Sequence, residues 1–527
     1  MSDYRFLPEE RPTFPGSPYI PSHPTARRFA YAGVAIVTGI SATLGNALVT
    51  VNTTQIGGSL GIELDQATFL PAVYVAANAT ANLLLVKARI QFGVKSVTYG
   101  VVLLYMVAAL VELFMPGFGS AIFTRASSGI AAGALTTFTL YNLLQAFPAR
   151  LRPAALIFGV TIPQLGTPLA RLIPIDVITL GGWSGLNLIE VATALMVLAV
   201  MTWLPLPTSD RGPAFEKLDF VSIALLMPGF YLLCTVLGLG RLLWWTDTPW
   251  LGTALAASIA LIAAGLILEW HRSHPLLQLR WIGTVEIIRF ALIAALVRVA
   301  LAEQTYGAVG LLTAAGLNND QLHVLFAIVF VAMILGATGA LVLAKPTRLS
   351  LPIAVAALVI ALGSWLDSQG NNLTRPEQLY LSQALIGFGS AMFLGPSLVY
   401  GFLNMIKRGP DHLVSLITVF SMSQNIGGLG GSALLGTMQV VATRAHAQEI
   451  TNHLQASDPL VAARLSNGSA ALMQIVNREA SVLAFSDVFL SVAVFALLIS
   501  LYLFFRYLQT VRRERREQHD RLATAPA

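Results

Sequence analysis

Among the charged side chains that lie inside long apolar stretches of this sequence, five are candidates for chemistry. Arg125, Arg171 and Glu190 fall in the first half of the chain, and Arg298 and Glu303 in the second. Ionisable groups at membrane depth are energetically costly, so they pair or line water and often mark ion or substrate pathways. We expect Glu190 or Glu303 to bind and release a proton, with the arginines tuning that site or holding an anion. The alternative is a set of inert buried ion pairs that lock helices together.

The positions of these charges suggest partners. Arg171 and Glu190 lie at similar depths in consecutive apolar stretches joined by a short loop, which favours a salt bridge or a shared cavity. Arg298 and Glu303 are five residues apart, and that spacing does not place two side chains together on a helix, so each is expected to face a different partner. Asn46 and Gln304 are further candidates for contact with a substrate.

Fourteen stretches are long and apolar enough to cross a membrane, because a bilayer core needs roughly 20 apolar helical residues. They fall into groups of six, two and six, which predicts an all-α polytopic membrane protein with two six-helix bundles and a linker pair. The predicted spans are 29–51, 66–86, 96–115, 120–143, 154–176 and 185–205, then 218–239 and 250–270, then 284–307, 320–344, 349–366, 378–405, 413–440 and 484–506.

The same pattern divides the chain into five parts. Polar, proline-containing stretches flank the middle pair of spans and set it apart as a linker. The predicted parts are an N-terminal tail at 1–28, a first bundle at 29–205, a linker with two spans at 206–283, a second bundle at 284–506 that includes the long outer segment 441–483, and a basic tail at 507–527.

Composition and charge agree with a membrane protein. Hydrophobic residues make up 55% of the chain and charged residues 11%. Lysine and arginine concentrate in the loops on the side of the two termini, which predicts cytoplasmic termini in a bacterial inner membrane. A nucleic-acid partner is not expected, since no basic soluble domain accompanies the net charge of +6. The lone cysteine, Cys234, is read as an apolar filler.

No motif indicates an enzyme. None of the five lysines follows a glycine, so a phosphate-binding Gly-Lys-Ser/Thr loop is absent from the sequence. No nucleophile and base stand together, no cofactor is expected, and the histidines lack the cysteine or carboxylate companions of a metal site. The lipid bilayer, a small-molecule substrate and protons are the expected partners, and the expected process is secondary transport.

Several local sequences carry a family resemblance. They are Gln383–Pro396, Ser423–Ser432, Ser486–Phe489, Gly57–Gly61, Thr124-Arg125 and Gly182-Trp183. With the layout of the spans, they resemble the fourteen-span drug:proton antiporter branch of the major facilitator superfamily (MFS), of the EmrB/QacA type. The resemblance implies the MFS fold, proton-coupled drug export, and a periplasmic membrane-fusion adaptor with an outer-membrane channel.

The chain departs from that family at three motifs. In the loop between spans two and three, Val86, Ile90 and Gln91 replace gating residues, and only Gly93 and Lys95 remain as gating candidates. Span five carries Pro163, Gly166 and Pro168 as hinge candidates, but its antiporter motif is altered. Span one has Gly45, beside Asn46, where the family has an aspartate. The coupling acid is therefore sought in spans six and nine.

The outer segment 441–483 has an amphipathic pattern that predicts short helices broken at Ser457-Asp458-Pro459. It is interpreted as a docking surface for the adaptor or as a lid on the protein's own outer face. Taken together, the sequence favours an exporter of small amphipathic or acidic compounds by proton antiport and alternating access. The alternative is an importer or facilitator of an organic anion without proton antiport.

Overall fold

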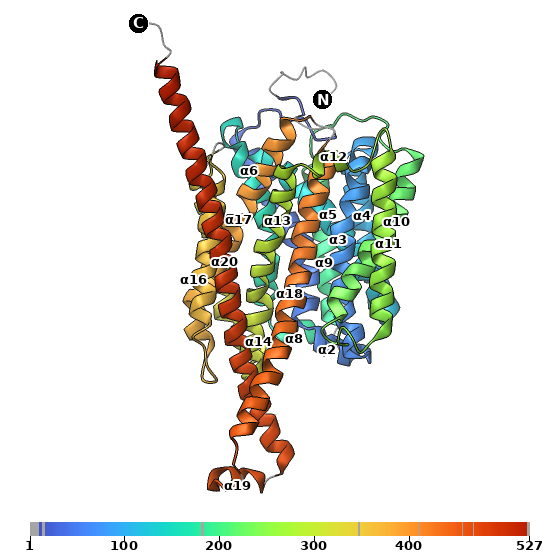
Figure 1. Ribbon diagram of the computed structural model, residues 1–527. Helices are drawn as coiled ribbons and strands as arrows, with labels where there is room; N and C mark the ends of the chain where they lie inside the picture. Colours follow the sequence, from blue (N-terminus) through green and yellow to red (C-terminus); the bar gives the residue numbers. More distant parts are fainter. Residues whose placement is uncertain are drawn as a thin grey trace. The chain divides into compact units, whose positions relative to one another are not determined.

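A computed structural model describes residues 10–12, 16–180, 184–345, 348–409, 412–455, 457–466 and 468–523 (Figure 1). Gly182-Trp183 and most of the predicted tail before residue 16 lie outside these residues. The described chain is helical, and its one β-type pairing is an isolated bridge between Pro18 and Ser209. The prediction of an all-α fold is confirmed.

The helices follow the predicted spans closely. Those of the first half are α1 (Thr25–Val51), α2 (Thr53–Leu60), α3 (Leu64–Phe92), α4 (Val94–Phe114), α5 (Phe118–Ala146), α6 (Arg152–Gln164), α7 (Gly166–Ala170), α8 (Ile175–Thr179), α9 (Ser184–Trp203), α10 (Lys217–Leu239) and α11 (Pro249–His271). Those of the second half are α12 (Leu279–Ile282), α13 (Val285–Ala300), α14 (Val309–Ala314), α15 (His323–Leu343), α16 (Ser350–Asp367), α17 (Tyr380–Ile406), α18 (Leu413–His453), α19 (Pro459–Leu465) and α20 (Ser469–Ala523).

Twelve helical segments of the described residues are long and apolar enough to cross a membrane. The other two predicted spans, 120–143 and 284–307, also coincide with helices. The first is α5, which is rich in serine, threonine and glycine. The second is α13, which has only 16 residues before the helix changes type. That these two helices also cross the membrane stays a prediction.

Two spans and the outer segment differ in detail from the sequence-based expectation. Span 154–176 is not one helix: α6 ends at Gln164 and α7 begins at Gly166, because Pro168 has no N–H to donate to the carbonyl of Gln164. In span 284–307, α13 gives way to a π-helical turn, η3 (Glu303–Ala308). The outer segment 441–483 contains only one short helix, α19, because α18 and α20 both extend far into it.

The break before α19 falls where proline punctuation predicts it. The Asp458 side chain accepts a hydrogen bond from the Leu460 N–H, and Pro459 occupies the first helical position. The extensions of α18 and α20 pack against each other, with Gln439 Nε2 donating to Ser481 Oγ at 3.0 Å. His446 Nε2 and Asp487 Oδ2 lie 2.7 Å apart. The segment is therefore a helical hairpin rather than a string of short helices.

The chain forms two compact units. Unit 1 contains residues 1–299, 318–327 and 401–434, and unit 2 contains 300–317, 328–400 and 435–527. In unit 1, α5 packs against α1 and α3, and the linker helices α10 and α11 pair with each other while α10 packs on α3. In unit 2, α16 packs along α20. The five predicted parts of the chain stay a prediction.

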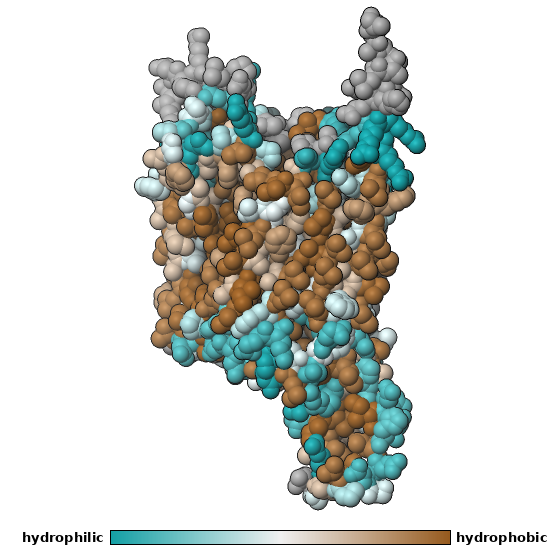
Figure 2. Space-filling model, turned by 90° about the vertical axis from the view of Figure 1, so that its left-hand side faces the viewer, coloured by the Kyte–Doolittle hydropathy of each residue, from teal (hydrophilic) through white to brown (hydrophobic). Residues whose placement is uncertain are grey.

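Within unit 2, α16 and α20 present an apolar surface. Figure 2 shows hydrophobic side chains over the middle of the face that these helices cover and hydrophilic ones at both ends. Leu362 and Trp365 of α16 and Val494 and Leu501 of α20 are exposed there. Large exposed apolar side chains along whole helices are what a lipid-facing surface requires.

Candidate functional site

A buried ion pair joins α5 and α9 in unit 1. Arg125 Nη2 donates a hydrogen bond to Glu190 Oε1, and both side chains are buried. The pair leaves two polar atoms without a hydrogen-bond partner, Nη1 of Arg125 and Oε2 of Glu190. Each partner therefore keeps hydrogen-bonding capacity that the protein does not use.

Two more polar groups surround this pair, and we call the four residues Arg125, Glu190, Glu112 and Tyr105 the Arg125 cluster. Glu112 of α4 is buried and interacts electrostatically with both Arg125 and Glu190. Its Oε2 atom also has no hydrogen-bond partner. Tyr105, also on α4, brings its hydroxyl to the same place as the Glu190 carboxylate. Two acids and one arginine therefore share this site.

A small cavity borders the cluster between α1, α3, α4 and α5. The Oδ1 atom of Asn46, on the cavity wall, is buried without a hydrogen-bond partner. The wall thus offers hydroxyl and amide groups as well as apolar carbons. Its residues are Ser41, Ala42, Gly45, Asn46, Tyr74, Tyr105, Ser128, Ala131, Ala132 and Leu135.

Arg171 does not pair with Glu190, contrary to the expectation from their similar depth. Its Nη1 donates to Asn319 Oδ1 at 3.2 Å, and Asn319 Nδ2 donates back to the Arg171 carbonyl at 3.2 Å. The guanidinium also lies 5.1 Å from the ring centre of Phe326. Helix packing explains the difference. Helix α9 packs against α4 and α1, and these two helices also pack against α5, so Glu190 lies near Arg125 of α5.

Arg298 lies against the glycine-rich part of α18. A Cβ atom on Gly428 would lie 3.1 Å from Arg298 Nε, so a larger residue there would have to displace the guanidinium. This Nε atom is buried without a hydrogen-bond partner, and no described acidic group pairs with Arg298. On the same helix, Asn425 Oδ1 accepts from Asn78 Nδ2 of α3 at 3.3 Å.

Glu303 meets a second acid in unit 2. Gln383 Nε2 of α17 lies 3.2 Å from Glu303 Oε1 and 2.6 Å from Asp367 Oδ2 of α16. Both carboxyl groups therefore contact the same amide nitrogen. Gln304 turns to the same helix and donates from Nε2 to the Gln383 carbonyl at 3.3 Å. All three members of the Glu303–Asp367–Gln383 group are buried.

The hinge candidates lie where the chain bends. Thr43 of α1 donates from Oγ1 to the Pro163 carbonyl, in the last turn of α6. Gly166 lies against the α1 backbone, where a Cβ atom would be 3.1 Å from the Ile40 carbonyl oxygen. Pro168 follows in α7 and is buried. Pro163 and Gly166 thus both contact α1.

The gating candidates lie at the turn between α3 and α4. Gly93 has a φ of +86°, and a Cβ atom on it would lie 2.9 Å from Nε of Arg211. Lys95 is exposed and lies 5.6 Å from the ring centre of Tyr99. Gln91 Oε1 accepts from the backbone N–H groups of Ala214 and Phe215. The turn therefore contacts the start of the linker.

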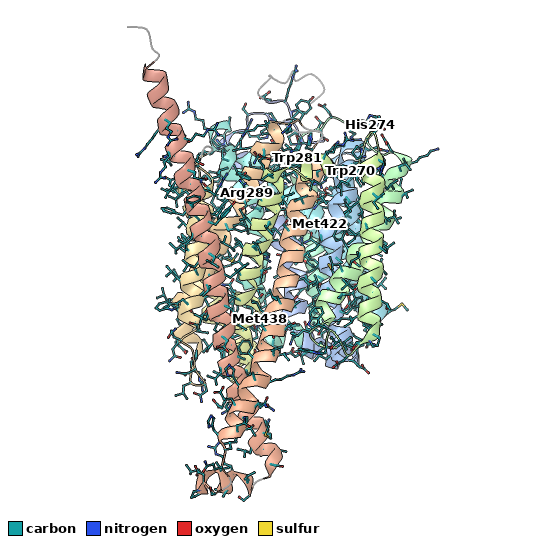
Figure 3. The ribbon with its side chains drawn as sticks, in the orientation of Figure 1. Trp270, His274, Trp281, Arg289, Met422 and Met438 are labelled. Atoms are coloured by element: carbon teal, nitrogen blue, oxygen red, sulfur yellow. The ribbon has the colours of Figure 1, made fainter. Side chains whose placement is uncertain are left out.

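An ionic network, which we call the linker clasp, ties the linker helices to α3. Lys87 Nζ lies 2.6 Å from Asp219 Oδ2, and Arg272 Nη2 lies 2.8 Å from Asp219 Oδ1. Arg272 Nη1 lies 2.7 Å from Glu269 Oε1. Figure 3 labels Trp270 and His274, which flank Arg272 in sequence, at this end of unit 1.

Sequence analysis missed Glu112 and Asp367 as site residues. Glu112 lies inside the predicted span 96–115 and could have been found by the same search for in-span acids. Asp367 lies one residue beyond the predicted end of span 349–366, so a boundary error of one residue hid it. Among the described residues, no group of three or more His, Cys, Asp or Glu side chains is arranged to hold a metal ion.

Comparison with solved structures identifies the fold. A proton-dependent oligopeptide transporter aligns with a TM-score of 0.56 at 12% identity, over 92% of this chain and 99% of that one. A POT-family transporter in complex with 5-aminolevulinic acid gives 0.55 at 12% identity, over 91% and 96%. A double-tryptophan mutant of XylE gives 0.55 at 13% identity, over 91% and 96%. No family model matches the sequence, and no curated protein matches it significantly. The chain has an MFS-type, multi-pass membrane fold.

Proposed function

We propose that this chain is a secondary active transporter that exports small amphipathic or acidic organic compounds, as the inner-membrane part of a larger efflux system in bacteria, with protons moving in the opposite direction. One observation carries the proposal. The Arg125–Glu190 pair is buried beside a polar cavity, and each partner keeps an unused hydrogen-bonding atom. A pair held only to lock two helices would have no reason to leave both atoms unsatisfied.

The coupling follows from the chemistry of Glu190. A protonated Glu190 no longer attracts Arg125 or a cationic substrate, whereas an ionised Glu190 attracts both. A proton and a cationic amphipathic substrate therefore compete for one carboxyl group. Competition for a site that opens alternately to the two sides of the membrane produces antiport. The Arg125 side chain keeps the ionised acid from remaining unpaired when the substrate leaves.

An anionic substrate would behave differently at the same pair, and this supports the second candidate, transport of an organic anion without antiport. A carboxylate ligand can accept from Nη1 of Arg125, the atom that the protein leaves free. To replace Glu190 at the arginine, it requires Glu190 to be protonated, so the anion and the proton move together. The unpaired Arg298 and the 5-aminolevulinic acid bound by one structural neighbour favour this alternative.

Proton flux in proteoliposomes distinguishes the two candidates. The protein is reconstituted with a pH-sensitive dye inside, and ethidium or 5-aminolevulinic acid is added outside. Antiport predicts that ethidium entry drives protons out, while anion cotransport predicts that 5-aminolevulinic acid entry carries protons in. Glu190→Gln should abolish proton movement in either case. Glu377→Gln, which changes an exposed acid, serves as the matched control.

We propose that the α18–α20 hairpin is the docking site for a periplasmic adaptor that leads to an outer-membrane channel, with both chain termini in the cytoplasm. The hairpin extends away from the other helices of unit 2 (Figure 1), and Leu460, Leu465 and Met473 are exposed on it. An exposed apolar patch rimmed by polar groups suits a protein partner. Leu460→Asp with Met473→Asp should lower efflux from whole cells and leave transport in proteoliposomes unchanged. Loss of both would instead favour the lid interpretation.

A further inference from the structure

We propose that Glu303 and Asp367 form a second proton-binding site, in which the two carboxyl groups share one proton that Glu303 carries. The observation behind this proposal is that two buried acids in unit 2 contact the same amide nitrogen, Gln383 Nε2. A neutral amide group does not balance two buried negative charges, so we infer that one of the two acids is protonated. The bound species is therefore a proton, and its place is between α16 and η3.

The surroundings of the two acids also disfavour the state in which both are ionised. The two oxygens that contact Gln383 Nε2 lie within about 6 Å of each other, the range in which two like charges disfavour ionisation. No described lysine, arginine or histidine forms an ion pair with either acid. The second oxygens, Oε2 of Glu303 and Oδ1 of Asp367, are enclosed without a hydrogen-bond donor. Two bare carboxylates in this place would have no counter-charge.

A buried hydroxyl group without a hydrogen-bond partner lies near the two acids. Ser364 lies one helical turn before Asp367 on α16, is fully buried, and has no hydrogen-bond partner for its Oγ atom. Residues three apart share a helix face, so this hydroxyl lies on the side of α16 that carries Asp367. Across from them, Gly307 of η3 packs against Phe489 of α20, where a Cβ atom would lie 2.6 Å from the ring. The facing groups on α20 are aromatic, Phe485 and Phe489, and carry no charge.

The hydrogen-bond donors decide which acid holds the proton. Asp367 receives the shorter contact from Gln383, 2.6 Å against 3.2 Å for Glu303. Donors stabilise the charged form of a carboxyl group, so Asp367 is the anion and Glu303 the acid. Glu303 also begins the π-helical turn, and such turns occur frequently at functional sites because they re-aim a side chain.

The test measures protonation directly, without a substrate. Infrared spectra of the purified full-length protein at neutral pH should contain a protonated-carboxyl band that is lost in Glu303→Gln and kept in Asp367→Asn. Glu377→Gln, which alters an exposed acid in the neighbouring segment, should leave the band unchanged. Loss of the band in Asp367→Asn, or its persistence in Glu303→Gln, would overturn the assignment. Thermal unfolding of each variant reports whether it remains folded.

Two further arms separate the remaining outcomes. If replacing potassium by sodium removes the band in the wild-type protein, the pair is a sodium site and the proposal is wrong. The use of the shared proton in transport rests on the proposed function and is tested separately. Glu303→Gln should lose accumulation of ethidium against a gradient and keep exchange of ethidium between equal concentrations. A protein that shows the infrared pattern but no ethidium transport would contradict the proposed function and leave the shared proton established.

Discussion

Gly45 of α1 and Glu190 of α9 face each other so closely that no side chain fits between them. A Cβ atom on Gly45 would lie 2.8 Å from Oε1 of Glu190 and 2.9 Å from the Tyr105 hydroxyl oxygen. The Glu190 carboxylate thus reaches from the sixth predicted span to the surface of the first. A carboxyl group placed on α1 at position 45 would occupy nearly the same position, next to Arg125.

This geometry predicts that the carboxyl group can be moved from one helix to the other. Gly45→Asp alone should reduce transport by at least about tenfold, because overpacking and a second charge together cost roughly 2 kcal/mol. Glu190→Ala alone should remove coupling. The double variant should regain proton-coupled ethidium transport in proteoliposomes. Gly33→Asp is the control, since Gly33 of α1 has open space around its Cβ position. A double variant as inactive as Glu190→Ala would contradict the prediction.

The Arg125–Glu190 pair should be strongly coupled in stability. Arg125→Leu leaves Glu190 buried without its cation, and Glu190→Leu leaves Arg125 without its nearest anion, so each should destabilise the protein by about 3–5 kcal/mol. Replacing both by leucine removes the two buried charges together and should cost much less than the sum. Unfolding in detergent, followed for the two single variants and the double variant, measures this difference. Additive losses would show that the two charges do not interact.

The linker clasp should depend on Arg272. Burial lowers the pKa of this guanidinium, but the carboxylates of Asp219 and Glu269 raise it more, so its pKa lies above the ordinary value. A raised pKa means that its contribution to stability is present at and below neutral pH and is lost only in strong alkali. Arg272→Gln should therefore destabilise the protein at every pH from 5 to 9, by about 3 kcal/mol, since it leaves the buried Glu269 without its cation and Asp219 with Lys87 alone.

The matched control for that variant is Arg280→Gln. Arg280 is exposed and lies 5.9 Å from the ring centre of Trp270, so its loss should change stability by less than about 1 kcal/mol. Thermal unfolding at several pH values compares the two. Equal effects of the two substitutions would show that the clasp does not stabilise the linker.

The contact between Arg171 and Asn319 should open during transport. It joins the broken fifth predicted span to the start of the tenth, and both residues are partly buried. Arg171→Cys with Asn319→Cys should allow an oxidant or a short cross-linker to hold these segments together and stop transport, and a reducing agent should restore it. The native Cys234 is buried and should not interfere. Full transport by the cross-linked protein would mean that this contact is static.

Sequence reasoning located the helices well and the contacts between them less well. A span is visible in twenty successive apolar residues, but the neighbour of Glu190 depends on how α9 packs, and similar depth pointed to Arg171 instead of Arg125. The prolines of span five predicted a bend, and the structure has one at Leu165. The amphipathic pattern of 441–483 predicted helices, but not that they continue α18 and α20.

The acid at Asp367 illustrates a different limit. Its partner Glu303 was identified because it lies inside an apolar stretch, whereas Asp367 ends its helix and looked like a loop residue. Only the packing of α16 against its neighbours encloses it. A charged residue at the edge of a span is ambiguous in sequence, since its burial is decided by helices far away along the chain.

The continuity of α20 has a mechanical consequence. This single helix runs from Ser469 in the hairpin to Ala523 in the basic tail, a length of roughly 80 Å at 1.5 Å per residue. Near its far end, Glu514 pairs with Arg348 at 2.7 Å. A rigid rod cannot tilt at one end alone. A tilt of α20 at the hairpin is therefore also a tilt at the tail, and one free-energy change describes both. By thermodynamic reciprocity, a ligand at the hairpin that changes binding at the tail by some factor has its own binding changed by the same factor.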